Sequence, residues 1–370
     1  MALSIQASAP GKLYIAGEYA VVHPGNEAVI TSTPQRLTVT IKESSHTGLI
    51  HSQLMNGLPL QWYRRGGDLV IDERENPYHL IIAALKVVEG YVKEKGIPVR
   101  YYHLDVSSDL NNSDGVKYGL GSSGAVTIAT IKAVLAFYGL KQEAKDPMFV
   151  YKCGVITHMQ SGNNGSYGDL ACSAFEGVIH YTSPNRQTIK TWLEEGLSLS
   201  SILTELEWPH LAIQPVLIHP SLRLIVGWTG EPVSTAQQLD NLNAPDDLKV
   251  QDMPLNLFSS LSNNLVRDLL PALASGNLTR LRFVLEDCRQ LLIRYTTLHR
   301  ISFETPKLKE LVQLSKKEHL PSKSSGAGGG DCGITFTHRL TTAVNNRLIS
   351  ALKATEIIIL PFEWEGAYNA

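Results

Sequence analysis

The feature that most constrains the fold of this chain is a glycine- and serine-rich turn that runs into a long apolar segment. The turn is Gly119-Leu120-Gly121-Ser122-Ser123-Gly124, and the segment from Ser122 to Phe137 is apolar on nearly all sides. This pattern predicts a helix buried between a sheet and other structure. A helix start presents unpaired N–H groups and partial positive charge, and glycines let the backbone approach a phosphate closely. The turn is therefore a candidate phosphate cradle, although a serine-capped glycine turn also begins many helices that bind nothing.

A second glycine-rich stretch lies near the other end of the chain, Lys323-Ser324-Ser325-Gly326-Ala327-Gly328-Gly329-Gly330-Asp331. Its backbone could fold tightly against a ligand, or it could be a flexible linker. A linker would rarely lead directly into a predicted strand, which here covers Ile334 to Thr337.

Two further segments carry charged residues among small and apolar ones. Pro10 to Tyr19 contains Lys12 and Glu18, and Asn163 to Asp169 is a polar turn that leads into an apolar run. Taken alone, Lys12 would be a solvated lysine and Asp169 the N-cap of a helix.

Composition narrows the class of protein. The chain has 370 residues, of which 43% are hydrophobic and 18% charged, and this length favours two domains. The net charge is −2, and no basic run interleaves with aromatic residues, so a nucleic-acid or membrane-surface partner is not expected. No signal peptide or run of about 18 apolar residues is evident, which predicts a cytoplasmic protein. The four cysteines form no C-x-x-C pair and are expected to be free thiols.

Hydrophobic periodicity predicts strands and helices in an irregular order, which favours an α+β fold. A turn-rich break at Ser183 to Arg186 suggests domains of residues 1–185 and 186–370. The predicted strands are Leu37–Ile41, Arg100–Val106, Val178–Tyr181, Leu222–Trp228, Ile334–Thr337 and Glu356–Phe362. The other predicted helices are Leu80–Val92, Leu255–Ala274, Leu278–Tyr295, Pro306–Lys317 and Thr342–Ala354.

Together, these segments resemble the GHMP kinases, the superfamily of galactokinase, homoserine kinase, mevalonate kinase and phosphomevalonate kinase. Pro10 to Tyr19 is similar to the first motif of that family, Gly119 to Gly124 to its phosphate loop, and Lys323 to Gly333 to its third motif. The resemblance implies a two-domain fold, with a ribosomal S5 domain 2-like N-terminal domain and a ferredoxin-like C-terminal domain.

The resemblance is closest to the bacterial phosphomevalonate kinases of this family. It rests on Gly11 to Tyr19, Lys117-Tyr118, Gly165 to Cys172, and Gly227-Trp228-Thr229-Gly230 followed by Ser234. It implies transfer of the γ-phosphoryl group of ATP to the phosphate of phosphomevalonate, with Mg²⁺ as cofactor and a monomer or homodimer as the working form.

The resemblance also implies roles for individual residues. Lys12 and Asp169 would be catalytic, and the hydroxyl of Ser123 would bind Mg²⁺. The residues implied to bind ATP are Lys117, Gly119, Leu120, Gly121, Ser122, Ser123 and Gly124. Those implied to bind the acceptor are Lys12, Glu18, Tyr19, Ser166, Ser234, Ser325, Gly326, Ala327 and Gly328.

Two departures from the family pattern accompany these expectations. Val116 and Lys117 replace a proline and a glycine before the loop, and Lys117 could itself touch phosphate. Residues 157–162 lack the metal-binding acid that several relatives carry there, so the resemblance supplies no second protein ligand for Mg²⁺.

The alternative functions are another GHMP enzyme, such as mevalonate kinase or mevalonate diphosphate decarboxylase, and an inactive nucleotide-binding sensor. A sensor would be expected to lose Lys12 or Asp169, and both are present.

Overall fold

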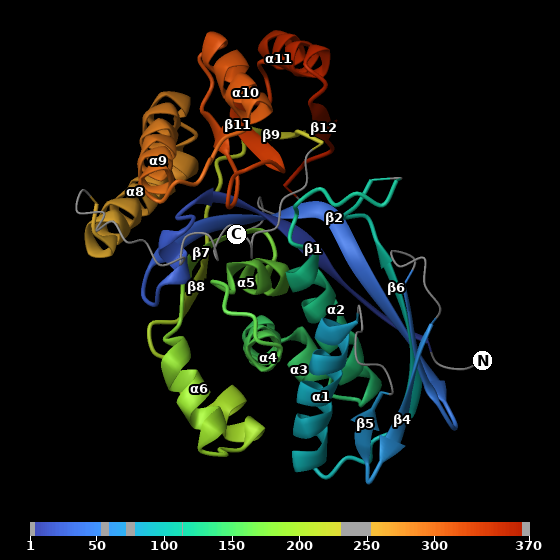
Figure 1. The fold of residues 1–370 in the computed structure, drawn as a ribbon. Helices are drawn as coiled ribbons and strands as arrows, with labels where there is room; N and C mark the ends of the chain where they lie inside the picture. The colour runs from blue at the N-terminus through green and yellow to red at the C-terminus, as the bar shows by residue number, and fades with distance from the viewer. Residues whose placement is uncertain (1–3, 53–58, 72–77, 113, 231–252, 365–370) are drawn as a thin grey trace.

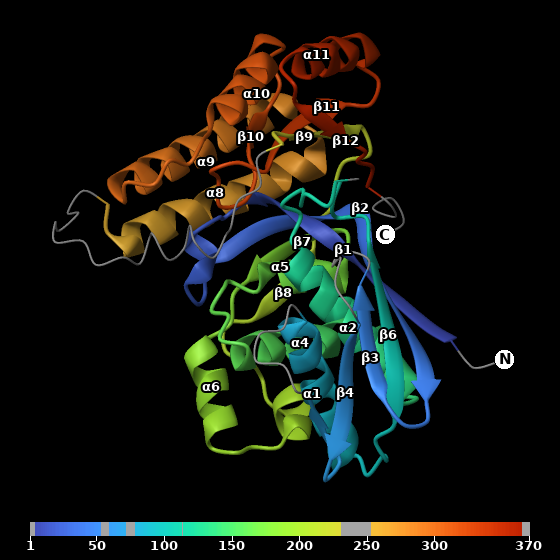
Figure 2. The same ribbon diagram turned by 45° about the vertical axis from the view of Figure 1, so that its right-hand side comes forward.

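The computed structural model describes residues 4–52, 59–71, 78–112, 114–230 and 253–364. The described residues form two sheets with helices against them (Figure 1). Helices α8 to α11 lie on one side of the molecule and α1, α2 and α4 on the other, with β1 and β2 passing between them (Figures 1 and 2).

The larger sheet has eight strands in the order β5-β4-β3-β6-β2-β7-β8, with β1 paired to β2. Apart from the parallel pair of β3 and β6, its pairings are antiparallel. The strands are β1 (Ser4–Ala16), β2 (Glu27–Ser44), β3 (Gly48–Ser52), β4 (Leu60–Arg65), β5 (Asp68–Val70), β6 (Tyr101–Ser108), β7 (Val178–Thr182) and β8 (Ala212–Pro215).

Helix α2 (Ser122–Phe137) lies at the centre of this part of the molecule. It contacts β1 and β2 of the sheet and the neighbouring helices on its other sides, so it is buried nearly all round as its sequence predicts. Its helical neighbours are α1 (His79–Glu94), α3 (Lys141–Lys145), α4 (Pro147–Gln160) and α5 (Gly168–Phe175).

The smaller sheet has four antiparallel strands in the order β10-β11-β9-β12. In chain order this arrangement is the 4-1-3-2 pattern of a ferredoxin-like domain, read from the β12 edge. The strands are β9 (Leu222–Trp228), β10 (Ser322–Ser324), β11 (Cys332–His338) and β12 (Ile358–Leu360). The helices are α8 (Leu255–Ser275), α9 (Leu278–Leu298), α10 (Pro306–Lys317) and α11 (Thr342–Ala354).

The expected α+β class and its two-domain arrangement are confirmed, and several predicted elements match within one or two residues. Helix α10 illustrates why: the Thr305 side chain accepts a hydrogen bond from the backbone N–H of Leu308, and Pro306 occupies the first turn. The final strand is shorter than predicted and covers only Ile358–Leu360.

The expected division at residue 185 does not match the sheet. Strand β8 pairs with β7, and between them lie α6 (Arg186–Glu194) and a single turn at Ser201–Glu205 that contacts α4. The larger sheet therefore continues past residue 185, and we propose that the division lies after β8.

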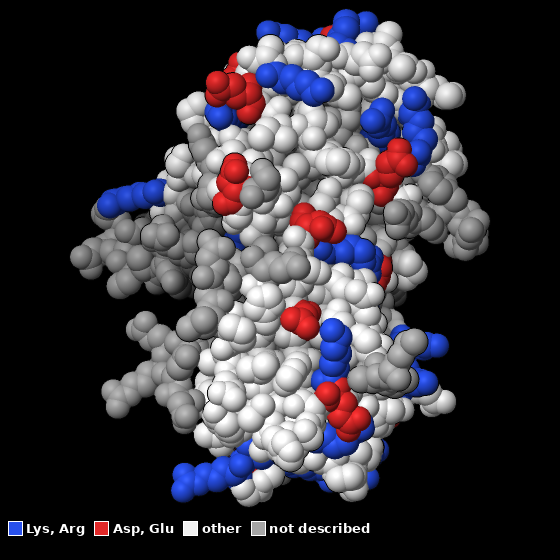
Figure 3. Space-filling model, turned by 90° about the vertical axis from the view of Figure 1, so that its right-hand side faces the viewer, with Lys and Arg blue, Asp and Glu red and all other residues white. Residues whose placement is uncertain are grey.

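None of the helices in the described ranges is long and apolar enough to cross a membrane. On the face shown in Figure 3, the acidic and basic side chains of the described residues are interspersed.

Candidate active site

The phosphate loop adopts a conformation that requires its glycines. Gly119 and Gly121 have φ angles of 76° and 77°, in the left-handed region, and Gly121 is the N-cap of α2. A Cβ on Gly119 would overlap the carboxylate of Asp331, which arrives from the third motif. The backbone of the loop therefore depends on its glycines, and the loop contacts Asp331 of the other domain.

Lys12 joins the phosphate loop to the third motif. The register of β1 against β2 shifts between Pro10 and Lys12, and the backbone N–H of Lys12 donates to the carbonyl of Leu120 at 2.8 Å. A Cβ built on Gly121 would lie 2.9 Å from Lys12 Cγ, and one on Gly326 would lie 3.9 Å from Lys12 Nζ. The amine therefore lies where both glycine-rich segments meet.

Asp169 lies in the first turn of α5 and is not its cap, because the N-cap is Tyr167. The N-cap interpretation of Asp169 is therefore wrong. A Cβ built on Gly124 would lie 2.9 Å from Asp169 Oδ2, so the carboxylate rests against the first turn of α2. That turn also contains Ser123, the expected metal ligand.

Tyrosine hydroxyls surround the segment before Asp169. Tyr14 Oη and Ser166 Oγ are 2.9 Å apart, and the Tyr181 hydroxyl donates to the carbonyl of Ser166 at 2.7 Å. Burial, followed by the charge of Asp169, raises the pKa of Tyr14 well above its usual value, so Tyr14 stays neutral. Ser166 is therefore held in place by neutral hydroxyls.

The third motif is an ordered part of the interface between the two domains, which excludes the linker interpretation. Ser325 Oγ donates to the carbonyl of Tyr14 at 2.9 Å, and the hydroxyl of Tyr19 donates to the carbonyl of Ala327 at 2.6 Å. The glycine at position 328 allows the backbone to pack closely against Phe303, because a Cβ there would overlap that residue.

The remaining predicted residues differ in where the structure places them. Glu18 is buried and forms an ion pair with Lys323, away from any open surface. Lys117 is exposed, and its backbone forms an isolated bridge with Asn111. Ser234 lies outside the described residues.

Comparison of the sequence with known proteins shows the family to which the chain belongs. The model of the GHMP kinases N terminal domain matches residues 79–177. The chain is 34% identical to the phosphomevalonate kinase of Streptomyces sp. (strain CL190) over 343 residues, 90% of each chain. The chain belongs to the GHMP kinase family.

Two other comparisons show the range of similarity within the GHMP kinases. The solved structure of Streptococcus pneumoniae phosphomevalonate kinase in complex with phosphomevalonate and AMPPNP is 30% identical, with a TM-score of 0.84 and coverage of 97% of this chain and 99% of that one. The mevalonate kinase of Methanocaldococcus jannaschii is 23% identical over 337 residues, 89% of this chain and 90% of the other.

Two residues of this GHMP kinase site were missed from the sequence. One is Asp331, whose carboxylate meets Gly119. The other is His158, which is 1% exposed and has Nε2 3.0 Å from Thr127 Oγ1, while that hydroxyl lies 2.8 Å from the carbonyl of Ser123. Burial lowers the pKa of His158, and the Asp169 carboxylate partly opposes this. Asp331 stands at the end of the glycine-rich stretch, which was the one signal for it, and His158 had none, because its contact with Thr127 joins distant segments.

The donor atoms at the loop fit the expected cofactors. Ser123 belongs to the first turn of α2, and the Asp169 carboxylate rests against the same turn at Gly124; hydroxyl and carboxylate oxygens of this kind suit Mg²⁺. In the described ranges, no group of three or more His, Cys, Asp or Glu side chains could hold a metal ion.

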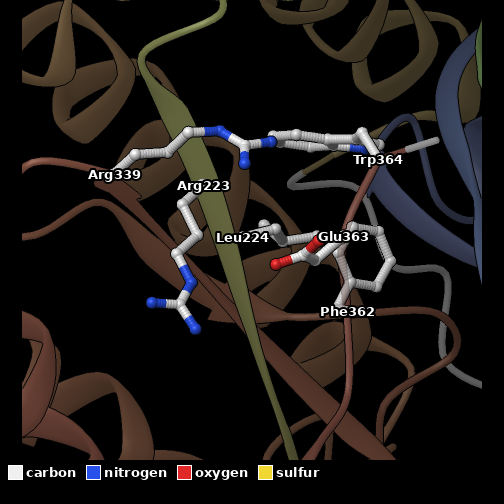
Figure 4. Close-up of a pocket in the computed structure, with 6 residues that line it drawn as sticks. All are labelled: Arg223, Leu224, Arg339, Phe362, Glu363 and Trp364. Atoms are coloured by element: carbon white, nitrogen blue, oxygen red, sulfur yellow. The ribbon is translucent and has the colours of Figure 1, made fainter. Parts of the chain in front are cut away.

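A separate pocket of about 230 Å³ lies in the C-terminal domain (Figure 4). Its lining residues are Arg223, Leu224, Arg339, Phe362, Glu363 and Trp364. It includes none of the predicted site residues, so the candidate active site is defined by the convergent loops and not by this pocket.

Proposed function

We propose that this chain is a phosphomevalonate kinase, which transfers the γ-phosphoryl group of ATP to the phosphate of 5-phosphomevalonate and releases 5-diphosphomevalonate and ADP. The observation that carries the proposal is the position of Lys12 between the phosphate loop and the third motif. Phosphoryl transfer needs such an arrangement because the protein acts mainly by aligning the two substrates and neutralising charge. The choice of acceptor rests on the 34% identity to a phosphomevalonate kinase, against 23% to a mevalonate kinase.

The phosphate loop would hold ATP through its backbone. The N–H groups of Gly119 to Ser122 and the start of α2 favour phosphate oxygens, and Lys117 is exposed at the edge of the loop. The Ser123 hydroxyl and the Asp169 carboxylate would hold Mg²⁺, which neutralises charge on the β- and γ-phosphates when bound.

Lys12 would stabilise the transferring group. Its amine carries positive charge, and it lies beside the loop and beside Gly326 of the third motif. Charge develops on the transferring phosphoryl oxygens and on the bridging oxygen in the transition state, where a fixed cation is most effective.

Asp169 would have a different task with this acceptor than with an alcohol. The second pKa of a phosphomonoester is about 6, so the attacking oxygen is largely ionised at neutral pH. No strong base is then needed, and Asp169 would orient Lys12 or the metal ion.

A coupled assay of ADP release tests the proposal. The panel contains mevalonate, phosphomevalonate, diphosphomevalonate, homoserine and galactose, and we expect turnover with phosphomevalonate alone. Turnover with mevalonate or release of CO₂ from diphosphomevalonate would assign another GHMP activity, and no ADP with any acceptor would indicate a nucleotide sensor. The cytoplasmic location and the monomeric or homodimeric form remain predictions.

A further inference from the structure

A buried ion pair connects the first motif with the third. The side chains of Lys323 and Glu18 are 0% and 2% exposed, although the two residues lie 305 positions apart in the sequence. Lys323 Nζ donates to Glu18 Oε1 and also to the carbonyl of Ser324 at 2.6 Å. The pair therefore lies at the junction of the two domains.

We propose that Glu18 and Lys323 are a positioning pair that sets the third motif against Lys12, so that Glu18 acts through the protein and does not bind the acceptor. This inference rests on the proposed function, because it concerns the acceptor side of that site. The charged side chain of Glu18 from the N-terminal domain and that of Lys323 from the C-terminal domain together fix the backbone around Gly326.

The hydrogen bonds around the pair support a positioning role. The backbone N–H of Gly326 lies 3.4 Å from Glu18 Oε1, and Gly326 is the residue beside the Lys12 amine. Tyr19, the next residue after Glu18, donates to the carbonyl of Ala327 at 2.6 Å. Contacts from two consecutive residues, Glu18 and Tyr19, thus hold the backbone of two consecutive residues of the third motif, Gly326 and Ala327.

The other end of the pair is anchored in the C-terminal domain. Ser324 Oγ donates to Glu304 Oε1 at 3.0 Å, and Glu304 accepts two hydrogen bonds from Arg289 of α9, at 2.7 and 2.6 Å. A shift of Lys323 would therefore also disturb the hydrogen bonds through Ser324 and Glu304 that connect the third motif to α9.

Stability alone does not account for this arrangement. Burying two charges removes them from water, and well-packed apolar residues of similar volume are often as stabilising. Glu18 Oε2 is also buried and has no hydrogen-bond partner among the described residues, which costs folding free energy. An apolar pair could fill the same volume, but it could not accept from Gly326 or donate to Ser324.

The test compares the double variant Glu18→Met/Lys323→Met with a matched control at another buried ion pair. The control is Arg64→Met/Glu89→Met, whose side chains are 9% and 4% exposed and belong to the larger sheet and α1. For each folded enzyme, Tm, AMPPNP affinity, and kcat and KM for each substrate are measured.

We expect the Glu18→Met/Lys323→Met enzyme to bind AMPPNP within about twofold of wild type but to lose roughly 10²-fold in kcat or in kcat/KM for phosphomevalonate, because a displacement of about 1 Å has that effect. The control should keep both constants, whatever its Tm. Wild-type kinetics in the first double variant would overturn the proposal, and so would an equal loss in the control.

Tyr19→Phe provides a second measurement if the first double variant does not fold. It removes only the hydroxyl that holds Ala327, and we expect a loss of about 5- to 10-fold in kcat/KM for phosphomevalonate with unchanged AMPPNP affinity, as one hydrogen bond to the backbone is lost. Unchanged kinetics would then count against the positioning role. If the wild-type enzyme uses another acceptor, the proposed function is wrong. The kinetics of the same variants are then measured with that acceptor, which tests the positioning role of Glu18 and Lys323 independently of the proposed function.

Discussion

The donor side and the acceptor side of the candidate site are built in different ways. The donor side is one continuous segment, Gly119 to Gly124, whose shape follows from its own glycines and from the helix it begins. The acceptor side is assembled from distant segments, since the hydrogen bonds of Tyr14, Tyr19 and Ser325 span 152 to 311 residues. Local sequence can therefore specify a phosphate cradle, but acceptor recognition depends on how two domains meet.

This difference predicts two kinds of sensitivity to mutation. Substitutions on the donor side should act through steric overlap at a single residue. Substitutions on the acceptor side should act through displaced backbone and should affect turnover while leaving nucleotide binding largely intact. Lys12 lies between the two sides, so it should show the largest effect.

Replacing Lys12 with Ala or with Met should lower kcat by about 10²- to 10³-fold while KM for ATP changes little, because the amine stabilises charge that develops in the transition state. Steady-state kinetics with both substrates measure this effect. Lys12→Met is the informative comparison, since it keeps most of the apolar stem that lies against Gly121. Retained turnover in Lys12→Met would show that the stem, and not the amine, matters.

Gly119→Ala should raise KM for ATP by about 10- to 100-fold, because the new methyl group would overlap Asp331 and displace the loop. Gly115→Ala is a matched control, since Gly115 also has a positive φ but a Cβ there would meet nothing within 4 Å. The control should lose some stability and keep its KM. Equal kinetic effects in the two variants would assign the defect to backbone strain.

Asp169→Asn should retain turnover with phosphomevalonate, with a loss smaller than the roughly 10²- to 10⁴-fold that an obligatory general base contributes. The pH–rate profile should rise near the second pKa of the acceptor, about 6, in both enzymes. Complete loss of activity in a folded variant, together with loss of the acidic limb, would show that a carboxylate base is required and would favour an alcohol acceptor.

The smallest expected effect concerns His158 and the pH dependence of stability. Its pKa is lowered in the folded protein from an ordinary value of 6.5, mainly by burial, so the unfolded state binds a proton first as the pH falls. Stability should decrease as the pH drops below about 6.5 and should level off below the folded pKa.

The measurement is Tm as a function of pH for the wild-type protein and for His158→Gln, which keeps a hydrogen-bond donor without titrating. The Tm of the variant should decrease less steeply with falling pH, and for a chain of 370 residues each kcal/mol of linked free energy corresponds to about 1–2 °C in Tm. Parallel curves for the two proteins would mean that His158 does not contribute.

Several elements of the fold could be predicted because their signals are local. Helix α10 begins with a threonine cap and a proline, and α2 is apolar on nearly all sides. Strands β3, β4 and β5 were missed because they have only five, six and three residues, too few for a clear pattern, although β3 pairs with β4 and β4 with β5 in chain order.

The sequence by itself determined the phosphate loop, its helix and the family to which the chain belongs. These depend on left-handed glycines, on helix starts and on periodic burial, which are properties of short segments. Only the tertiary structure decided that Glu18 is paired with Lys323 instead of facing the acceptor, that Asp169 lies in the first turn of α5, and that His158 contacts Thr127 of α2. Burial and pairing of a charge depend on groups that arrive from elsewhere in the chain, and no local pattern records which groups those will be.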